Sequence, residues 1–285
     1  MKQIFDTFIY SGEKELLISR ISQLNPQVDY FVIAESKMTF SGRLREVDMD
    51  FQHVMSSEHG EKIRWITLDV LEGKNAWERE AFQRESLCDG LQDIQAGDII
   101  MLSDVDEIPS KAYLQSLTKL DHGEILIAKM QLFRYCSHLE SSDKWHGTIA
   151  TSFSNSIPDM QTFRSRAVRY WLEDNARIFT NGGTHFTTFL NAKQFKEKIT
   201  SFSHTELNTF PYNNRFFLHL IIKLGFTIDG NEILKLTSKD KARISFGECS
   251  SSHKFDNLRI RIATLIQPLI RKIFLERVKN LSIPY

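Results

Sequence analysis

Four short apolar runs, separated by segments long enough to hold a helix, constrain the fold of this chain more than any other feature. The clearest run is VDYFVIA at Val28–Ala34, which is apolar almost throughout, as is typical of a strand covered on both faces. Similar strands are predicted at Gln3–Tyr10, Lys62–Val70 and Asp98–Ser103. Because parallel neighbours need long crossovers, this order predicts an α/β fold with a mostly parallel central sheet flanked by helices.

The connections between these runs carry helix signals of their own. Asn75 is followed three residues later by Glu78, a pair that resembles a capping box and predicts a helix over Ala76–Gln95. An earlier connection repeats leucine and isoleucine at helical spacing until Asn25-Pro26 ends the pattern.

Length and charge narrow the class of protein further. A chain of 285 residues, 41% of them hydrophobic, is long enough to bury one large core. Its 36 basic and 36 acidic residues cancel, which gives no general reason to expect a nucleic acid partner. We predict one domain over residues 1–250 and a separate tail over 251–285, and the oligomeric state stays open.

The cysteines and the first residues of the chain give an expectation for the cellular compartment of the protein. Cys88, Cys136 and Cys249 show neither metal-ligand nor Cys-x-x-Cys spacing, so we expect reduced thiols and a reducing compartment. The chain reaches Asp6 after two apolar residues, unlike a secretory signal, and no run approaches the ~20 apolar residues of a spanning helix. The predicted location is the cytoplasm, or the inner face of the membrane if the tail binds lipid.

An acidic cluster follows the last predicted strand. The stretch DIIMLSDVDEIP at Asp98–Pro109 places Asp104, Asp106 and Glu107 within four residues, and Glu35 follows another strand. Ligands of open parallel sheets bind at the carboxyl ends of the strands, where these side chains are expected. Neighbouring carboxylates are costly unless a cation or protons neutralise them, so the cluster predicts a divalent metal that bridges a diphosphate.

Two alternatives for the charged residues stay open at this point. The acidic cluster can instead begin a helix near Pro109, where negative side chains complement the helix dipole. In AWEREAFQR, Glu80 and Arg84 share one helix face and Arg79 lies on the adjoining one. Those arginines can meet a phosphate or the acidic cluster, or they can form a solvated surface.

Six stretches in order resemble the family 17 glycosyltransferases over roughly residues 3–230. They are DTFIYSGEKELLISRISQL, VDYFVIAESKMTFSG, AWEREAFQRESLCDGL, DIIMLSDVDEIP, NGGTHFTTF and KITSFSHTE. That family includes the enzyme that adds the bisecting β-1,4-linked N-acetylglucosamine to N-glycans, together with many bacterial relatives. The resemblance implies a GT-A type fold, a UDP-sugar donor, a divalent metal (Mn²⁺ or Mg²⁺) and inversion at the anomeric carbon.

The resemblance also assigns roles to residues. Asp106 becomes the direct metal ligand, and Asp104 contacts the metal or the ribose. The residues assigned to the nucleotide are Asp6, Glu35, Arg79, Arg84 and Asp104. The family's Gly-Gly-Trp-His segment corresponds to NGGTHF, where Thr184 replaces the tryptophan. The best-known relatives imply that the sugar transferred is N-acetylglucosamine.

The mechanism that fits is a single displacement, in which a base removes a proton from an acceptor hydroxyl on a glycan or lipid-linked oligosaccharide. Glu107, His185 and Glu206 are the candidate bases, and His204 is a further candidate ligand. Two other classes stay open. One is a nucleotidyltransferase or nucleotide-sugar hydrolase, and the other is a sugar-binding module without catalysis.

The middle of the chain offers acceptor candidates. SSDKWHGTIA is expected to form a polar loop, and its Trp145 either stacks on a sugar ring or packs in the core. Arg164, Arg166 and Arg169 either bind an anionic acceptor or line the solvent face of a strand.

The tail over residues 254–281 reads as a basic amphipathic helix that Pro268 kinks or splits. It either makes a peripheral membrane contact or docks its apolar stripe on protein. The stripe consists of Leu258, Ile262, Leu265, Leu269 and Ile273.

Overall fold

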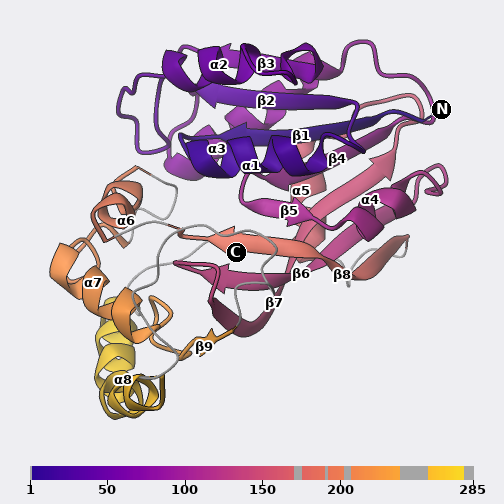
Figure 1. Cartoon of the computed structure of the whole chain (residues 1–285). Helices are drawn as coiled ribbons and strands as arrows, with labels where there is room; N and C mark the ends of the chain where they lie inside the picture. The colour runs from indigo at the N-terminus through magenta and orange to yellow at the C-terminus, as the bar shows by residue number, and fades with distance from the viewer. Residues whose placement is uncertain (1, 170–174, 190–191, 202–206, 238–255, 279–285) are drawn as a thin grey trace. The chain divides into compact units, whose positions relative to one another are not determined.

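The computed structural model describes residues 2–169, 175–189, 192–201, 207–237 and 256–278 (Figure 1). The chain divides into two compact units that interleave along the sequence. The first unit is Met1–Met130 with Trp145–His185, and the second is Gln131–Lys144 with Phe186–Tyr285. The domain boundary predicted at residue 250 lies outside the described residues.

Four parallel strands form one half of the sheet, in the order β3-β2-β1-β4. They are β1 (Ile4–Tyr10), β2 (Tyr30–Ser36), β3 (Ile63–Leu68) and β4 (Ile99–Asp104), and each falls on a predicted strand. In β1, β2 and β4 nearly every residue is buried, which explains why these runs are apolar throughout.

The other half of the sheet is not parallel where its pairing is determined. β7 (Leu139–Ser152) pairs antiparallel with β4, and β5 (Glu107–Pro109) pairs antiparallel with β8 (Ala176–Thr187). β6 (Ile125–Arg134) lies between β7 and β8, and β9 (Lys235–Leu236) pairs with β7. The α/β architecture is confirmed, whereas the mostly parallel pairing holds only for β1 to β4. An apolar run indicates that a strand is buried. It does not indicate whether that strand pairs parallel or antiparallel with its neighbour.

Helices of the first unit cover the sheet and connect its strands (Figure 1). The predicted capping box is confirmed, because Asn75 accepts a hydrogen bond from the Glu78 backbone N–H at 2.9 Å. The elements are α1 (Lys14–Leu24), α2 (Asp48–Met55), η1 (Gly60–Lys62), α3 (Ala76–Glu85), η2 (Ser86–Leu91), α4 (Lys111–Leu117) and α5 (Met160–Val168).

The helix predicted to run to Gln95 ends ten residues early, at Glu85, and continues as the 3₁₀ helix η2. Gly90 in η2 packs so closely on β2 that a β-carbon there would lie 2.3 Å from Val32 Cγ1. The close packing of η2 on the sheet therefore accompanies a 3₁₀ conformation at the place where periodicity alone predicts an α-helix.

The second unit contains α6 (Ala192–Ile199), α7 (Arg215–Leu224) and α8 (Asp256–Val278). Asn214 caps α7 through its side chain, and Gly225 ends that helix with a φ of +69°, a left-handed conformation that favours glycine. Pro268 lies inside α8 without splitting it, contrary to one of the two predicted outcomes. No helix in the described part of the chain is long and apolar enough to cross a membrane.

The prediction of three reduced cysteines is wrong at Cys136, which is disulfide-bonded. Cys88 is a free, half-buried thiol, and Cys249 lies outside the described residues. An odd number of cysteines without a recognisable spacing does not reveal which side chains the fold brings together. The cysteine pattern therefore no longer supports a reducing compartment.

Candidate active site

The acidic cluster lies where the chain turns back from the parallel half of the sheet. Asp104 ends β4, Asp106 lies in the turn, and Glu107 begins β5, in register with His185 of β8. The alternative of a helix start is wrong, because α4 begins only at Lys111 and is capped by the Ser110 side chain. The carboxylates thus extend from strand ends on ordered backbone.

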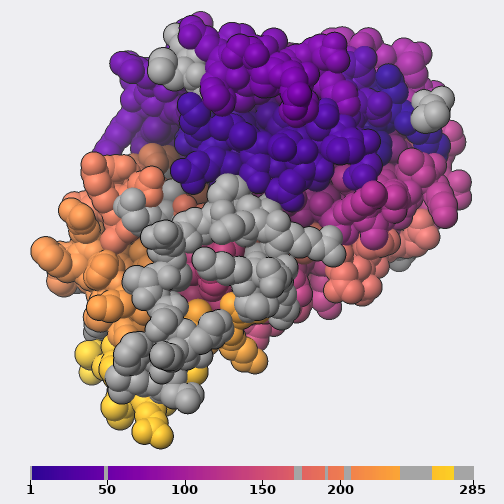
Figure 2. All heavy atoms as spheres, viewed as in Figure 1, coloured from indigo at the N-terminus to yellow at the C-terminus, as the bar shows by residue number. Residues whose placement is uncertain are grey.

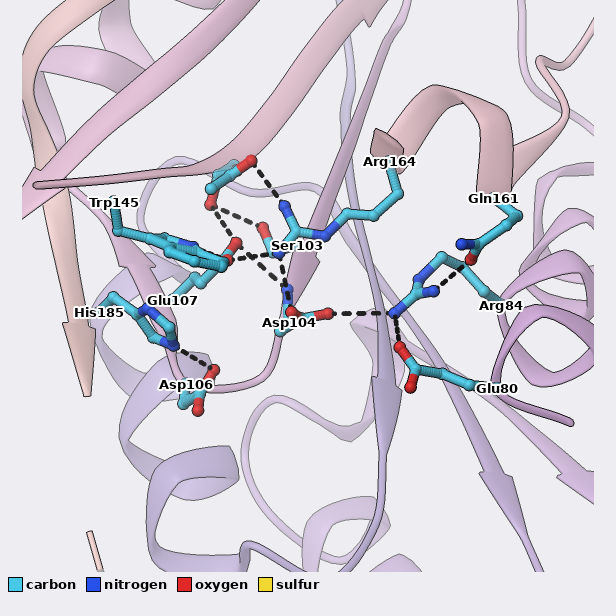
Figure 3. A network of polar contacts seen from close by, with 12 residues as sticks. Glu80, Arg84, Ser103, Asp104, Asp106, Glu107, Trp145, Gln161, Arg164 and His185 are labelled. Atoms are coloured by element: carbon cyan, nitrogen blue, oxygen red, sulfur yellow. Dashed lines mark hydrogen bonds and ion pairs between the residues drawn. The ribbon is translucent and has the colours of Figure 1, made fainter. Parts of the chain in front are cut away.

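Two arginines contact Asp104 (Figure 3). Its Oδ2 accepts a hydrogen bond from Arg164 Nη2 at 2.8 Å, and its Oδ1 lies 3.4 Å from Arg84 Nη2. Burial alone would raise the pKa of Asp104, but the charges of Arg164 and Arg84 outweigh it and hold the pKa below its usual range. The Asp104 side chain remains 34% exposed, so this ionised carboxylate can still meet a ligand.

Arg164 links two carboxylates and fixes their separation. Besides Asp104, its Nη2 contacts Glu107 Oε1 at 2.6 Å, and its Nη1 donates to the Gly147 carbonyl at 2.7 Å. Burial would lower the pKa of Arg164, but the two carboxylates outweigh it and raise that pKa above its ordinary value. Arg164 comes from helix α5, so the alternative of a strand is wrong there, and its contact with the acidic cluster was not anticipated from the sequence.

Glu107 is fully buried. It accepts hydrogen bonds from the Trp145 indole N–H and from the Asp104 backbone N–H, the latter at 3.3 Å. With Arg164 on the same carboxylate, Glu107 has no surface for an acceptor hydroxyl. The geometry therefore points to a positioning residue and not to the base that was one of the three candidates.

Asp106 and His185 form a second polar pair, on the turn and on β8. Asp106 Oδ1 lies 3.3 Å from His185 Nε2, and the two side chains are 13% and 10% exposed. The Trp145 ring lies beside the imidazole, with 4.9 Å between ring centroids (Figure 3). Trp145 belongs to strand β7, so the predicted polar loop is wrong there.

These side chains fit a divalent cation by their chemistry. Carboxylate oxygens suit Mg²⁺ and Mn²⁺, and an imidazole nitrogen is a common partner for transition metals. Asp106 supplies the oxygen and His185 the nitrogen, while Asp104 lies two residues before Asp106. Among the described residues there is no group of three or more histidines, cysteines or acids that could hold a metal. A cation here would therefore depend on ligands from the substrate or water.

Of the two predicted arginines, only Arg84 joins the acidic cluster. Its Nη2 also contacts Glu80 Oε1 at 2.8 Å, and its Nη1 donates to the Gln161 side chain. Its Nε is buried and has no hydrogen-bond partner among the residues the structure describes. Arg79 instead donates to the Phe40 carbonyl at 2.8 Å.

Asp6, predicted to contact the nucleotide, lies in a fully buried ion pair with Arg20 of α1. The guanidinium donates to both carboxylate oxygens, at 2.8 and 2.6 Å. It also donates to the backbone carbonyls of Asp104, at 3.2 Å, and of Glu107. Asp6 therefore supports the acidic cluster from beneath, and we replace its predicted nucleotide contact with this positioning role.

Arg20 is the second site residue that sequence reasoning missed. It stands three residues after Leu17 and next to Ile21, on the apolar face of α1, and it is fully buried. A basic residue inside an apolar helical stripe is the signal that could have found it, because such a charge needs a buried partner.

The remaining predicted site residues either pair with a residue outside the acidic cluster or lie outside the residues that the structure describes. Glu35 is the last residue but one of β2, is 1% exposed, and forms an ion pair with Arg45. Glu206 and His204 lie outside the described residues.

Comparison with known proteins gives one strong match. The model of the family described as Glycosyltransferase family 17 matches residues 1–216 of the chain. Among curated protein sequences, none matches.

Solved structures give weaker similarities. A mannosyltransferase from Pyrobaculum calidifontis, in complex with GDP-Man and Mn²⁺, has a TM-score of 0.43 at 9% identity and covers 99% of this chain and 76% of its own. HddC from Yersinia pseudotuberculosis has a TM-score of 0.40 at 12% identity, covering 64% of this chain and 92% of its own. GlyE, a glycosyltransferase from Streptococcus pneumoniae, has a TM-score of 0.32 at 14% identity, with coverage of 97% and 64%. These scores are low, so the similarities carry no weight for substrate or mechanism.

Proposed function

The chain belongs to glycosyltransferase family 17, and we propose that it transfers a hexose from a UDP-sugar to a hydroxyl of a glycan or lipid-linked oligosaccharide, with inversion at the anomeric carbon. The observation that carries this proposal is the pair of arginines on Asp104 at the carboxyl end of β4. Parallel sheets of this type bind ligands at that edge. Its GT-A type fold, a central sheet flanked by helices, is consistent with a nucleotide-sugar donor.

We assign a divalent cation, Mn²⁺ or Mg²⁺, to Asp106 and His185, with Asp104 beside them. When bound, such a cation neutralises the diphosphate and stabilises the leaving UDP. Asp104 stays ionised because of its two arginines, and it can accept a ribose hydroxyl or join the cation.

The chain's own residues supply the rest of the chemistry. Arg84 lies beside Asp104 and is the guanidinium assigned to the diphosphate, a group that a planar guanidinium binds well once its contacts with Gln161 and Glu80 are exchanged for the ligand. Arg164 and Glu107 hold Asp104 in place, and Arg20 holds the backbone beneath it. Of the three candidate bases, Glu107 is buried and Glu206 is undescribed, so His185 is the one whose position can be tested now.

Isothermal titration with UDP and several UDP-sugars, UDP-N-acetylglucosamine first, tests the proposal with and without Mn²⁺. We expect UDP binding that depends on Mn²⁺ and is lost in Asp106→Asn. Asp121→Asn, an exposed acid in the connection between α4 and β6, is the matched control and should bind normally. Absence of nucleotide binding under every condition would refute the proposal.

His185→Gln separates the two roles of the imidazole. If His185 holds the cation, the variant loses Mn²⁺-dependent UDP binding. If it is the base, the variant binds UDP normally and loses kcat. Product analysis then distinguishes transfer to an acceptor from hydrolysis or nucleotidyl transfer, and binding without turnover would indicate a sugar-binding module.

A further inference from the structure

Helix α8 has two apolar faces, and only one of them packs inside the second unit. Ala263, Ile266 and Ile270 belong to the core of that unit. Arg259 lies on the same side, is buried, and donates to the Leu224 and Leu234 carbonyls at 2.8 Å each. This face anchors α8 to its own unit.

The other face of α8 is the stripe noted in the sequence, and it is exposed. Leu265 is 81% exposed, Leu269 61% and Ile262 41%. They follow one another at three or four residues, so they lie along one side of the helix. The packing of α8 on its own unit therefore leaves Ile262, Leu265 and Leu269 exposed. These three residues are not part of the hydrophobic core of the second unit.

Basic residues bound the exposed stripe at both ends. Arg261 lies four residues before Leu265 and Lys272 three residues after Leu269, and both are exposed. From Asn257 to Leu275 the sequence has no acidic residue, although the whole chain has equal numbers of acids and bases. The local charge is therefore of one sign.

Helix α7, which contacts α8, also exposes apolar and basic side chains. Phe216 is 86% exposed and Leu220 is 43% exposed, and Lys223 is exposed one turn further on. The helix Arg215–Leu224 has no acidic residue. In Figure 2 atoms of both helices lie at the molecular surface, α7 in orange and α8 in yellow.

We infer that the exposed faces of α7 and α8 bind the surface of an anionic lipid bilayer. Apolar side chains enter the boundary between headgroups and acyl chains, while arginine and lysine contact anionic headgroups. The surface of a protein partner of ordinary composition carries both acids and bases, and a surface that binds it should do the same. The exposed charged side chains that the structure describes on α7 and α8 are all positive, which matches a bilayer that contains anionic lipids. The inference does not depend on the proposed function, since it concerns residues of the second unit alone.

Vesicle flotation of the full-length protein tests the inference, using phosphatidylcholine vesicles with and without phosphatidylglycerol. We expect the protein to float with the anionic vesicles, and this binding to weaken as salt is added. The double variant L265E/L269E should bind at least about tenfold more weakly. Arg261→Gln and Lys272→Gln should each cost about fivefold, and only on anionic vesicles.

Leu44→Glu is the matched control, because Leu44 belongs to the first unit and is 80% exposed. It should float as the unchanged protein does, and circular dichroism with urea unfolding checks that each variant is folded. The inference is overturned by no flotation, by equal binding to both vesicle types, or by loss of binding in Leu44→Glu. Dimers in sedimentation that L265E/L269E dissociates, without vesicle binding, would show instead that this face joins two copies.

Discussion

The acidic cluster of the first unit and the α7–α8 surface of the second unit use charge in opposite ways. At the cluster, Arg20 and Arg164 are buried and each contacts carboxylates at 2.6–2.8 Å. On α8, Arg261 and Lys272 are exposed beside apolar side chains in a segment without acids. The first arrangement fixes geometry, and the second leaves charge available to a partner.

The difference follows from the cost of removing a charge from water. A buried guanidinium is tolerated only with close, hydrogen-bonded partners, and it then holds those partners in one position. An exposed cation keeps its hydration and contributes little to folding, so its position is not constrained by stability. Substitutions in the cluster should therefore affect folding and catalysis together, whereas substitutions on the α7–α8 surface should affect neither.

The largest expected effect is on folding, from Arg20→Met. This change leaves Asp6 buried without its cation and should lower the free energy of unfolding by about 3–5 kcal/mol. Arg261→Met, at an exposed site, should change it by no more than about 0.5 kcal/mol. Urea unfolding of both variants measures the contrast, and equal losses would contradict it.

A second large effect is expected from Arg164→Met on the pH dependence of UDP binding. Arg164 is the main group that lowers the pKa of Asp104 below its usual value of 3.8, against the effect of burial. Without it the pKa rises, so Asp104 becomes protonated as the pH falls through the new value. Mn²⁺-dependent UDP binding should then be lost at mildly acidic pH, where the unchanged protein still binds.

At neutral pH the same variant should weaken UDP binding about tenfold to a hundredfold, because a charge-assisted hydrogen bond to Asp104 is lost. Titration over a pH series measures both effects. Arg166→Met, in the same helix, is the control. An unchanged pH profile in Arg164→Met would show that Arg164 does not act through Asp104.

An intermediate effect is expected from Glu107→Gln. The amide keeps the shape but weakens the contacts with Arg164 and Trp145, which should cost about 1–3 kcal/mol of stability. If Glu107 only positions Asp104, kcat should fall modestly and the pH optimum should stay in place. A base would behave differently, with kcat lost by several orders of magnitude while UDP binding stays intact.

The smallest effect should be that of Leu265→Ser on folding. Because Leu265 is 81% exposed, the change should alter the free energy of unfolding by no more than about 0.5 kcal/mol. Ile270→Ala, on the packed face of the same helix, should cost about 2–5 kcal/mol. Thermal or urea unfolding distinguishes the faces, and a large loss from Leu265→Ser would mean that its face is packed.

Sequence reasoning was strongest where one local pattern decides the structure. The strands β1, β2 and β4 were predicted because each is a buried apolar run, and the start of α3 because Asn75 and Glu78 are a local capping pair. It was weaker for α5, where a strand was one of two alternatives, and for β7, part of which was expected to be a loop. Those two elements are mixed in polarity, so neighbouring residues alone do not specify their conformation.

Part of the candidate site was likewise predictable from a local pattern, and part of it was not. The sequence alone determined the acidic turn after β4, because apolar strands that end in carboxylates mark the ligand edge of a parallel sheet. Only the tertiary structure decided that Arg164 and Arg20 complete that site and that Glu107 is buried within it. Arg164 lies 60 residues from Asp104 in the chain, and Arg20 lies 84 residues away. The physical reason is that burial and ion pairing depend on which distant segments pack together, and no local pattern records that.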